Sequence, residues 1–168
     1  MTIIMGVDPG FDKCGWGIVN DDGPNYVASG VIKTNSDWSY KERIDAVFNA
    51  IVHTINYHNV QVVGVEKPYV GEKVGRRVME VAGAWGIVLL ALHRCGCEYL
   101  ELSNSQIKAA VSGGRADKDQ VRKGVGTILG ISLNGPDDES DALAAAICCR
   151  DRWHLSHMAR EALANGRN

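Results

Sequence analysis

A short apolar segment that ends in an acidic residue constrains the fold of this chain more than any other feature. The segment from Ile3 to Val7 is apolar throughout, and Asp8-Pro9-Gly10 follows it directly. Such a run, stopped by turn-forming residues, is typical of a strand buried on both faces of a sheet. The segment therefore predicts a central strand with the Asp8 carboxylate at its carboxyl end, which is the edge where ligands collect in α/β sheets.

The rest of the chain alternates between strand and helix patterns. Further strands are predicted over residues 14–20, 26–34, 60–65 and 99–102. Helices are predicted from Ser39, which forms a capping box with Glu42, and over 78–92, 105–111, 117–129 and 135–147. The order β-β-β-α-β-α-β-α, with extra helices at the end, predicts a mixed five-stranded sheet flanked by helices. This is the α/β order of the RNase H-like fold, and we expect one domain over residues 1–150 and a helical tail over 151–168.

Composition fits a single compact domain and excludes some classes of protein. The five cysteines form no C-x-x-C pair, so we expect small buried side chains in a reducing compartment rather than a disulfide or zinc framework. No secretion signal is visible and no uninterrupted apolar run approaches about 18 residues, so we expect a cytoplasmic protein with no membrane segment. The net charge of −2 does not favour nucleic acid binding, but residues 67–123 carry ten basic and six acidic side chains. A local basic face is sufficient for contact with phosphates.

Four carboxylates are the candidate catalytic residues. Glu66, like Asp8, ends a short apolar strand, and adjacent central strands would bring the two together. Asp138 and Asp141 are three residues apart at the start of the last predicted helix and so share one face of it. A cluster of oxygen ligands without His or Cys favours a hard divalent ion, Mg²⁺ or Mn²⁺. Two such ions can activate water and stabilise the leaving 3′ oxygen in phosphodiester hydrolysis.

Each carboxylate also has a purely structural interpretation. Asp8 could initiate the turn formed with Pro9 and Gly10. Glu66 could be neutralised by Lys67 or by an arginine. The acidic residues 137–139 could simply favour the dipole of a helix N-terminus.

Several segments resemble the RuvC family of Holliday-junction resolvases. The resemblance rests on residues 5–10 (MGVDPG), 65–66 (VE) and 138–144 (DESDALA), which are similar to the three catalytic motifs of the family, and on two lysine-bearing segments, 105–108 (SQIK) and 114–121 (GRADKDQV). It covers residues 3–148 in order and with near-family spacing.

This resemblance implies an RNase H-like fold, a homodimer, and a site for two Mg²⁺ formed by Asp8, Glu66, Asp138 and Asp141. It implies paired symmetric nicks in a four-way junction, in recombination and repair, that leave 5′-phosphates and ligatable ends. A complex that drives branch migration is a further expected partner, and the apolar helix over 78–92 is the expected dimer interface. We keep Asp137 as an alternative to Asp138 in case the register is shifted by one.

The same resemblance identifies candidate residues for contact with DNA. These are Lys108, Lys118 and Arg115 for phosphates, Tyr69 for unstacked bases at the crossover, and Arg76 and Arg77 in the loop after it. Lys108 and Lys118 could instead be ordinary surface lysines, and Tyr69 a packed loop aromatic. Lys67-Pro68 after Glu66, tyrosine rather than phenylalanine at 69, and a longer loop depart from the family pattern, which leaves sequence preference and junction selectivity open.

Three other functions remain possible from the sequence. A nuclease of the same fold could cut forks, flaps or three-way junctions. The sugar-kinase and actin-like ATPases also have a first strand that ends in Asp-x-Gly, but they need a second domain that 168 residues cannot accommodate. A catalytically inactive junction-binding module is disfavoured because all four carboxylates are present.

Overall fold

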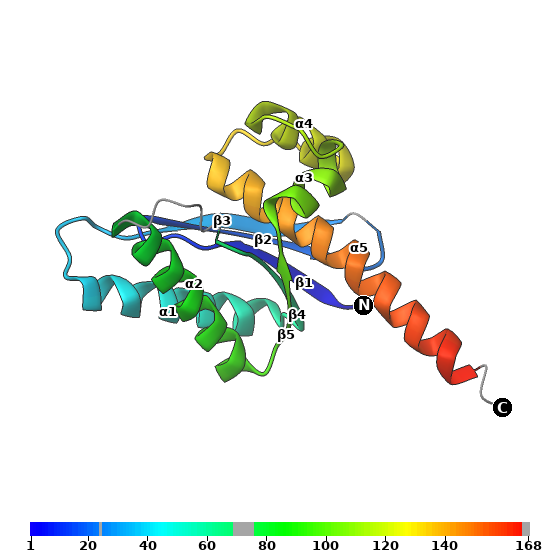
Figure 1. Ribbon diagram of the computed structural model, residues 1–168, viewed down its shortest axis with the longest axis horizontal. Coiled ribbons are helices and arrows are strands. Elements are labelled where there is room, and N and C mark those ends of the chain that lie inside the picture. The colour runs from blue at the N-terminus through cyan, green and yellow to red at the C-terminus, as the bar shows by residue number, and fades with distance from the viewer. Residues whose placement is uncertain (24, 69–75, 166–168) are drawn as a thin grey trace.

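The computed structural model describes residues 1–23, 25–68 and 76–165, which form the mixed five-stranded sheet that the sequence predicts (Figure 1). The strands are β1 (Ile3–Asp8), β2 (Lys13–Asn20), β3 (Tyr26–Lys33), β4 (Val62–Glu66) and β5 (Glu98–Leu102). Their order across the sheet is β3-β2-β1-β4-β5. β1, β2 and β3 pair antiparallel, whereas β4 pairs parallel with both β1 and β5. The parallel pairing places the carboxyl ends of β1 and β4 at the same edge.

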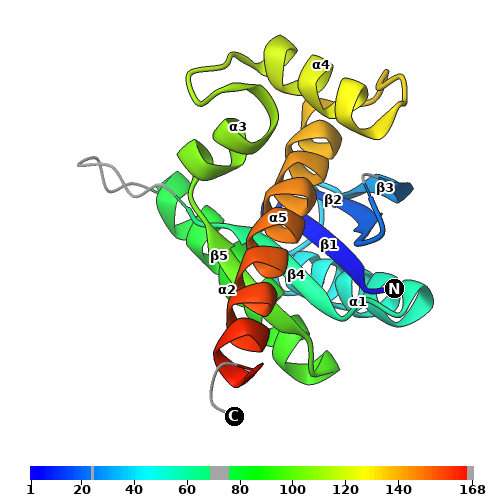
Figure 2. The ribbon, with the colours of Figure 1, turned by 90° about the vertical axis from the view of Figure 1, so that its right-hand side faces the viewer.

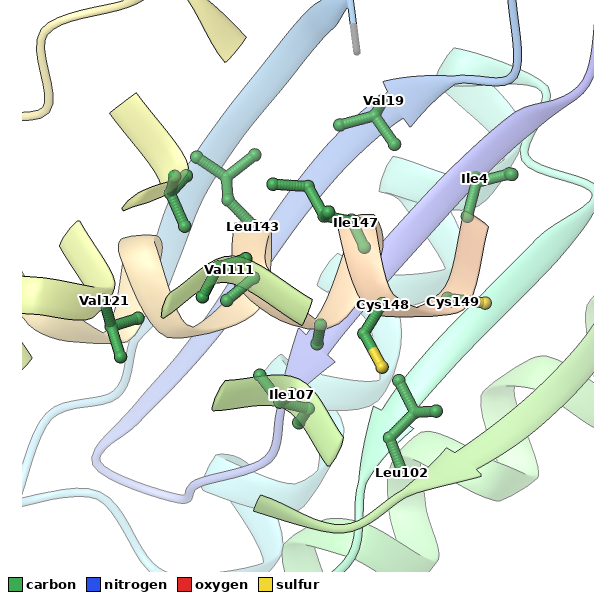
Figure 3. Close-up of a cluster of buried hydrophobic side chains, with 14 of the residues drawn as sticks. Ile4, Val19, Leu102, Ile107, Val111, Val121, Leu143, Ile147, Cys148 and Cys149 are labelled. Atoms are coloured by element: carbon green, nitrogen blue, oxygen red, sulfur yellow. The ribbon is translucent and has the colours of Figure 1, made fainter. Parts of the chain in front are cut away.

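Helices cover both faces of this sheet (Figures 1 and 2). The helices are α1 (Tyr40–His58), α2 (Arg76–Cys95), α3 (Asn104–Ser112), α4 (Lys118–Leu129) and α5 (Asp137–Asn165). α1 and α2 pack on one face, where Met5, Val7 and Val63 are fully buried. α3, α4 and α5 cover the other face over Ile4 and Val19, and Figure 3 shows this second core around α5. The alternation of side chains along the strands thus supplies two hydrophobic cores.

Local signals set the starts of three helices. Ser39 and Glu42 form the predicted capping box at α1. Ser103 with Gln106 caps α3, and Asp117 with Gln120 caps α4 in the same way. Each box satisfies backbone N–H groups that would otherwise lack an acceptor.

The packing of α2 corrects one expectation from the sequence. A helix apolar nearly all round and rich in Gly and Ala, as predicted over residues 78–92, would be deeply packed. In the described part of α2, however, the buried side chains are confined to one stripe, which comprises Ala84, Val88, Ala91 and Leu92. Met79 and Leu90 are 70% and 50% exposed. Residues Val78–Cys95 are also long and apolar enough to cross a membrane, which differs from the expectation that no such segment exists. Only 22% of this segment is buried, and its buried stripe packs in the core against α1 and the sheet.

A row of glycines lets α5 lie directly on the sheet. Gly17, Gly6 and Gly64 are aligned in register across β2, β1 and β4. A Cβ atom on Gly6 would overlap the carbonyl oxygen of Ala142 and the amide nitrogen of Ala146. On Gly64 it would lie 2.6 Å from the Cys149 Cβ. The absence of side chains in this row therefore sets the height of α5 above the sheet.

The predicted tail is part of α5 rather than a separate element. The helix runs without interruption through residue 150. Trp153 packs partly buried against the α5-side core, and the His154 Nε2 atom lies 3.1 Å from the carbonyl oxygen of Asp21. All five cysteines are free, as expected; Cys95 and Cys97, however, are only half-buried.

Candidate metal-binding active site

The structure brings the four predicted carboxylates to one edge of the sheet. Val7 of β1 pairs with Val65 of β4, so Asp8 and Glu66 follow at the same level on neighbouring strands. Asp8 is also paired with Gly15 of β2. A Cβ atom on Gly15 would overlap the carbonyl oxygen of Asp138, which places the first turn of α5 directly over this position.

The pKa shifts of Asp8 and Asp141 show that the four carboxylates interact electrostatically with one another. Burial, together with the charges of Glu66, Asp141 and Asp138, raises the pKa of Asp8 to about 8 against the opposing charge of Lys118. Burial is also the main cause that raises the pKa of Asp141 to about 6; here Lys118 opposes the rise and Glu66 adds to it. Like charges that gather in a partly desolvated site favour protonation or a bound cation. The negative charge of the cluster is therefore only partly balanced by Lys118.

Asp137, the alternative to Asp138, has other partners. The Lys118 Nζ atom lies 3.2 Å from its Oδ2 atom, and the Arg122 guanidinium donates to its Oδ1 atom. The hydrogen bond to Asp137 is the main cause that raises the pKa of Lys118. Asp137 thus anchors α4 to the start of α5, and these contacts favour Asp138 as the carboxylate available to the cluster.

Lys67 does not neutralise Glu66, which was one of the structural interpretations of this carboxylate. Lys67 forms an ion pair with Glu101, at 2.6 Å, instead of with Glu66. The Glu66 Oε1 atom accepts a hydrogen bond of 2.8 Å from the Nδ2 atom of Asn104, the first residue of α3. We did not predict a role for Asn104. Its signal in the sequence is an amide two residues after the strand predicted over residues 99–102, which the structure pairs with β4.

The predicted DNA-contacting residues have different placements. Lys118 lies beside the carboxylates, as its coupling to them shows. Lys108 donates a hydrogen bond of 2.9 Å to the carbonyl oxygen of Ala116, and so connects α3 to the turn before α4. Arg115 is exposed in this turn. Tyr69 and the side chains of Arg76 and Arg77 lie outside the described residues.

A hollow adjoins the carboxylates on the side of α2. It has a volume of about 120 Å³ and is lined by Asp8, Pro9, Glu66, Lys67, Pro68, Val81 and Trp85. A second hollow, of about 290 Å³, reaches Asp138 from the turn after β1. The carboxylate cluster is thus accessible from two sides.

The chemistry of the donor set fits a hard divalent ion. The donors are all carboxylate oxygens, their charge is uncompensated, and Asp8 is largely buried. Within the ranges that the structure describes, no three His, Cys, Asp or Glu side chains form a ready-made metal-binding group. Mg²⁺ usually retains several waters and is held by one or two carboxylates together with substrate phosphates, so it does not require a closed cage of protein ligands.

The fold and this site together define an RNase H-like protein with an acidic centre at the carboxyl ends of the neighbouring strands β1 and β4. A family model described as crossover junction endodeoxyribonuclease RuvC matches residues 4–149. The chain belongs to this RuvC family.

Relatives of known name support the assignment. The chain is 39% identical to the crossover junction endodeoxyribonuclease RuvC of Rubrobacter xylanophilus over 150 residues, which is 87% of this chain and 83% of the relative. It is 35% identical to the protein of the same name from Natranaerobius thermophilus over 157 residues, which is 91% of this chain and 97% of the relative.

Solved structures agree with the fold. Thermus thermophilus RuvC superposes with a TM-score of 0.82 at 26% identity and covers 92% of this chain and 97% of its own. The same protein in complex with a Holliday junction substrate superposes with a TM-score of 0.78, covering 88% of this chain and 92% of its own. The yeast mitochondrial Holliday junction resolvase Ydc2, at 15% identity and a TM-score of 0.59, shares the fold. These similarities confirm the predicted RNase H-like architecture.

Proposed function

We propose that this chain is a structure-selective endonuclease that resolves four-way (Holliday) DNA junctions by paired symmetric nicks. The reaction would leave 5′-phosphates and ligatable ends, and would serve recombination and repair in the cytoplasm. The observation that carries the proposal is the convergence of Asp8, Glu66, Asp138 and Asp141 at one sheet edge in a member of the RuvC family. The junction complex of the Thermus thermophilus relative supports the choice of substrate.

The four carboxylates are the proposed ligands of two Mg²⁺, for which Mn²⁺ would substitute. When bound, the ions would supply activation of a water and stabilisation of the leaving 3′ oxygen. Asp8 is largely buried at the end of β1, on the strand next to the one that carries Glu66, and its pKa responds to Glu66, Asp138 and Asp141, so it would be a ligand central to the cluster. The chain's own part in the reaction is to hold these oxygens in place and to exclude other cations from them.

Basic residues around the site are the proposed contacts to the DNA backbone. Lys118 remains protonated beside the carboxylates and would meet a phosphate near the scissile bond. Arg115 and Lys108 would contribute on the same side, Lys108 partly by holding the turn that carries Arg115. Tyr69, Arg76 and Arg77 keep their proposed roles at the crossover.

Incubation with a synthetic mobile four-way junction tests the proposal. We expect two symmetric nicks with Mg²⁺, none with EDTA, and none in a linear duplex of the same sequence. Forks, flaps and three-way junctions cut at equal rates would instead favour a broader branched-DNA nuclease. Absence of cleavage of every branched substrate in Mg²⁺ and in Mn²⁺ would contradict nuclease function.

We further propose a homodimer, because a junction with two-fold symmetry requires two equivalent sites. The exposed apolar side of α2, which carries Met79 and Leu90, is the proposed interface. Light scattering is expected to give the mass of two chains, and Leu90→Glu should shift it towards one chain because it places a charge in an apolar contact. A wild-type monomer at micromolar concentration, with and without junction, would contradict the dimer. A complex that drives branch migration remains a further proposed partner.

Metal binding is expected to stabilise the protein more as pH rises. Without metal, Asp8 and Asp141 have a higher pKa in the folded chain than in the unfolded chain. The folded state therefore binds more protons between about pH 4 and about pH 8, and the stability of the metal-free protein falls as pH rises through this window. Mg²⁺ must displace these protons, so it should raise the Tm little near pH 5.5 and clearly near pH 8.5, at about the same ion concentration. Equal shifts at both pH values in a thermal melt would contradict this coupling.

A further inference from the structure

Asn104 contacts the carboxylate cluster from the element after β5. Glu66 pairs with Leu102, and the Lys67 amide donates a hydrogen bond of 2.8 Å to the Leu102 carbonyl, so β4 and β5 stay paired to their ends. The chain then turns at Ser103 into α3, and Asn104 is its first residue. Its Nδ2 atom lies 2.8 Å from the Glu66 Oε1 atom.

The backbone position of Asn104 is fixed independently of Glu66. The Ser103 hydroxyl accepts from the Gln106 amide, and the Gln106 side chain accepts from the Ser103 amide at 2.9 Å. This capping box defines the first turn of α3 and with it the backbone of Asn104. The hydrogen bond to Glu66 is thus donated by a residue whose backbone is held in the first turn of α3.

The chemistry of the contact distinguishes it from an ion pair. Lys67, the nearest cation in the sequence, is held by Glu101 at 2.6 Å. An amide donor orients a carboxylate without cancelling its charge, whereas a lysine or arginine would compete with a metal ion for it. The contact engages one Glu66 carboxylate oxygen and leaves the charge of the carboxylate in place for a cation.

We infer that Asn104 is a positioning residue that fixes the Glu66 carboxylate for the divalent ion. The inference rests on the proposed function, because it assigns Glu66 to the metal. Partners that orient a ligating side chain commonly contribute about 10- to 100-fold to metal affinity or activity. The amide of Asn104 would supply such a contribution at this site.

Two substitutions at Asn104 separate positioning from packing. Asn104→Ala removes the donor and the volume, whereas Asn104→Leu removes the donor and keeps a similar volume. Both are expected to weaken binding of Mn²⁺ by about tenfold or more, measured by titration calorimetry on the full chain without DNA. Both should also raise the Mg²⁺ concentration that supports half-maximal junction cleavage, and excess Mg²⁺ should restore the rate. The matched control is Asn56→Ala, an exposed asparagine near the end of α1, from which the chain enters the end of β4 opposite to Glu66.

The outcomes distinguish this inference from the proposed function. Unchanged Mn²⁺ affinity in both Asn104 variants would overturn the inference, even if the wild type cuts junctions. A lower Tm of the metal-free variants with wild-type metal affinity would also overturn it, because Asn104 would then be structural. If the wild type binds Mn²⁺ but cuts no junction, the proposed function fails, and the calorimetry still decides the role of Asn104.

Discussion

Asp8→Asn is expected to reduce cleavage of a four-way junction by several orders of magnitude while the junction is still bound. The substitution keeps the shape of the side chain and removes one of the anionic groups that balance the charge of two Mg²⁺. Asp8 is the most strongly perturbed of the site's carboxyl groups, with its pKa raised to about 8, so its charge is the one most dependent on a cation. Binding rests on basic side chains outside the cluster and should persist in a gel-shift assay with Ca²⁺.

The stability of the metal-free Asp8→Asn variant is a second measure of the same feature. At neutral pH the metal-free wild type must take up a proton at Asp8 on folding or hold a like charge in the cluster, because the pKa of Asp8 is raised to about 8. Asparagine needs neither, so the Tm of the variant without metal should equal or exceed that of the wild type. Asp45→Asn, an exposed position on α1, makes the same chemical change away from the cluster and should leave cleavage unaffected. Cleavage by Asp8→Asn near the wild-type rate in Mg²⁺ would rule out the two-metal mechanism.

Gly6→Ala is expected to have the largest effect on folding. The added Cβ would overlap backbone atoms of Ala142 and Ala146, and backbone atoms cannot move aside as the end of a flexible side chain can. Overpacking of this kind costs about 3 kcal/mol or more. For a chain of this size the Tm should fall by roughly 6–12 °C, which a thermal melt can measure. Any folded fraction should also lose cleavage, because α5 carries Asp138 and Asp141.

Gly86→Ala provides the matched control. Gly86 lies in the interior of α2, and a Cβ atom there would meet nothing within 4 Å. Gly86 lies on the α2 face of Met79 and Leu90, the proposed dimer interface, so the control is made in the Leu90→Glu background. Alanine in a helix interior is more favourable than glycine by about 0.5–1 kcal/mol, so Gly86→Ala should be as stable as that background or more stable. Similar losses in the two variants would show that the close approach of α5 to the sheet does not constrain the fold.

The sequence was sufficient to predict the features that depend on local pattern. Apolar runs ending in Asp8 and Glu66 predicted two adjacent strand ends, and the spacing of Asp138 and Asp141 predicted one helix face. These signals are local because a strand end or a helix turn is set by a few consecutive residues.

Other features depend on contacts between distant segments. Asn104 reaches Glu66 across 38 positions, and nothing in its own neighbourhood indicates this partner. The partly exposed packing of α2 was mispredicted because an apolar composition does not show how much of a helix its neighbours cover. The structural role of the glycine row follows only from the strand register, which aligns Gly6, Gly17 and Gly64 beneath α5.

The continuity of α5 makes the acidic centre mechanically dependent on the far end of the molecule. A helix of 29 residues is about 43 Å long, and its contact with the glycine row lies between the end with Asp138 and the end that extends past the sheet (Figure 1). Because backbone touches backbone at that row, the helix has little freedom to slide and can move mainly by pivoting there. A force on the projecting end would therefore displace the first-turn carboxylates in the opposite direction. The His154 contact to the Asp21 carbonyl acts as a brace against this rotation.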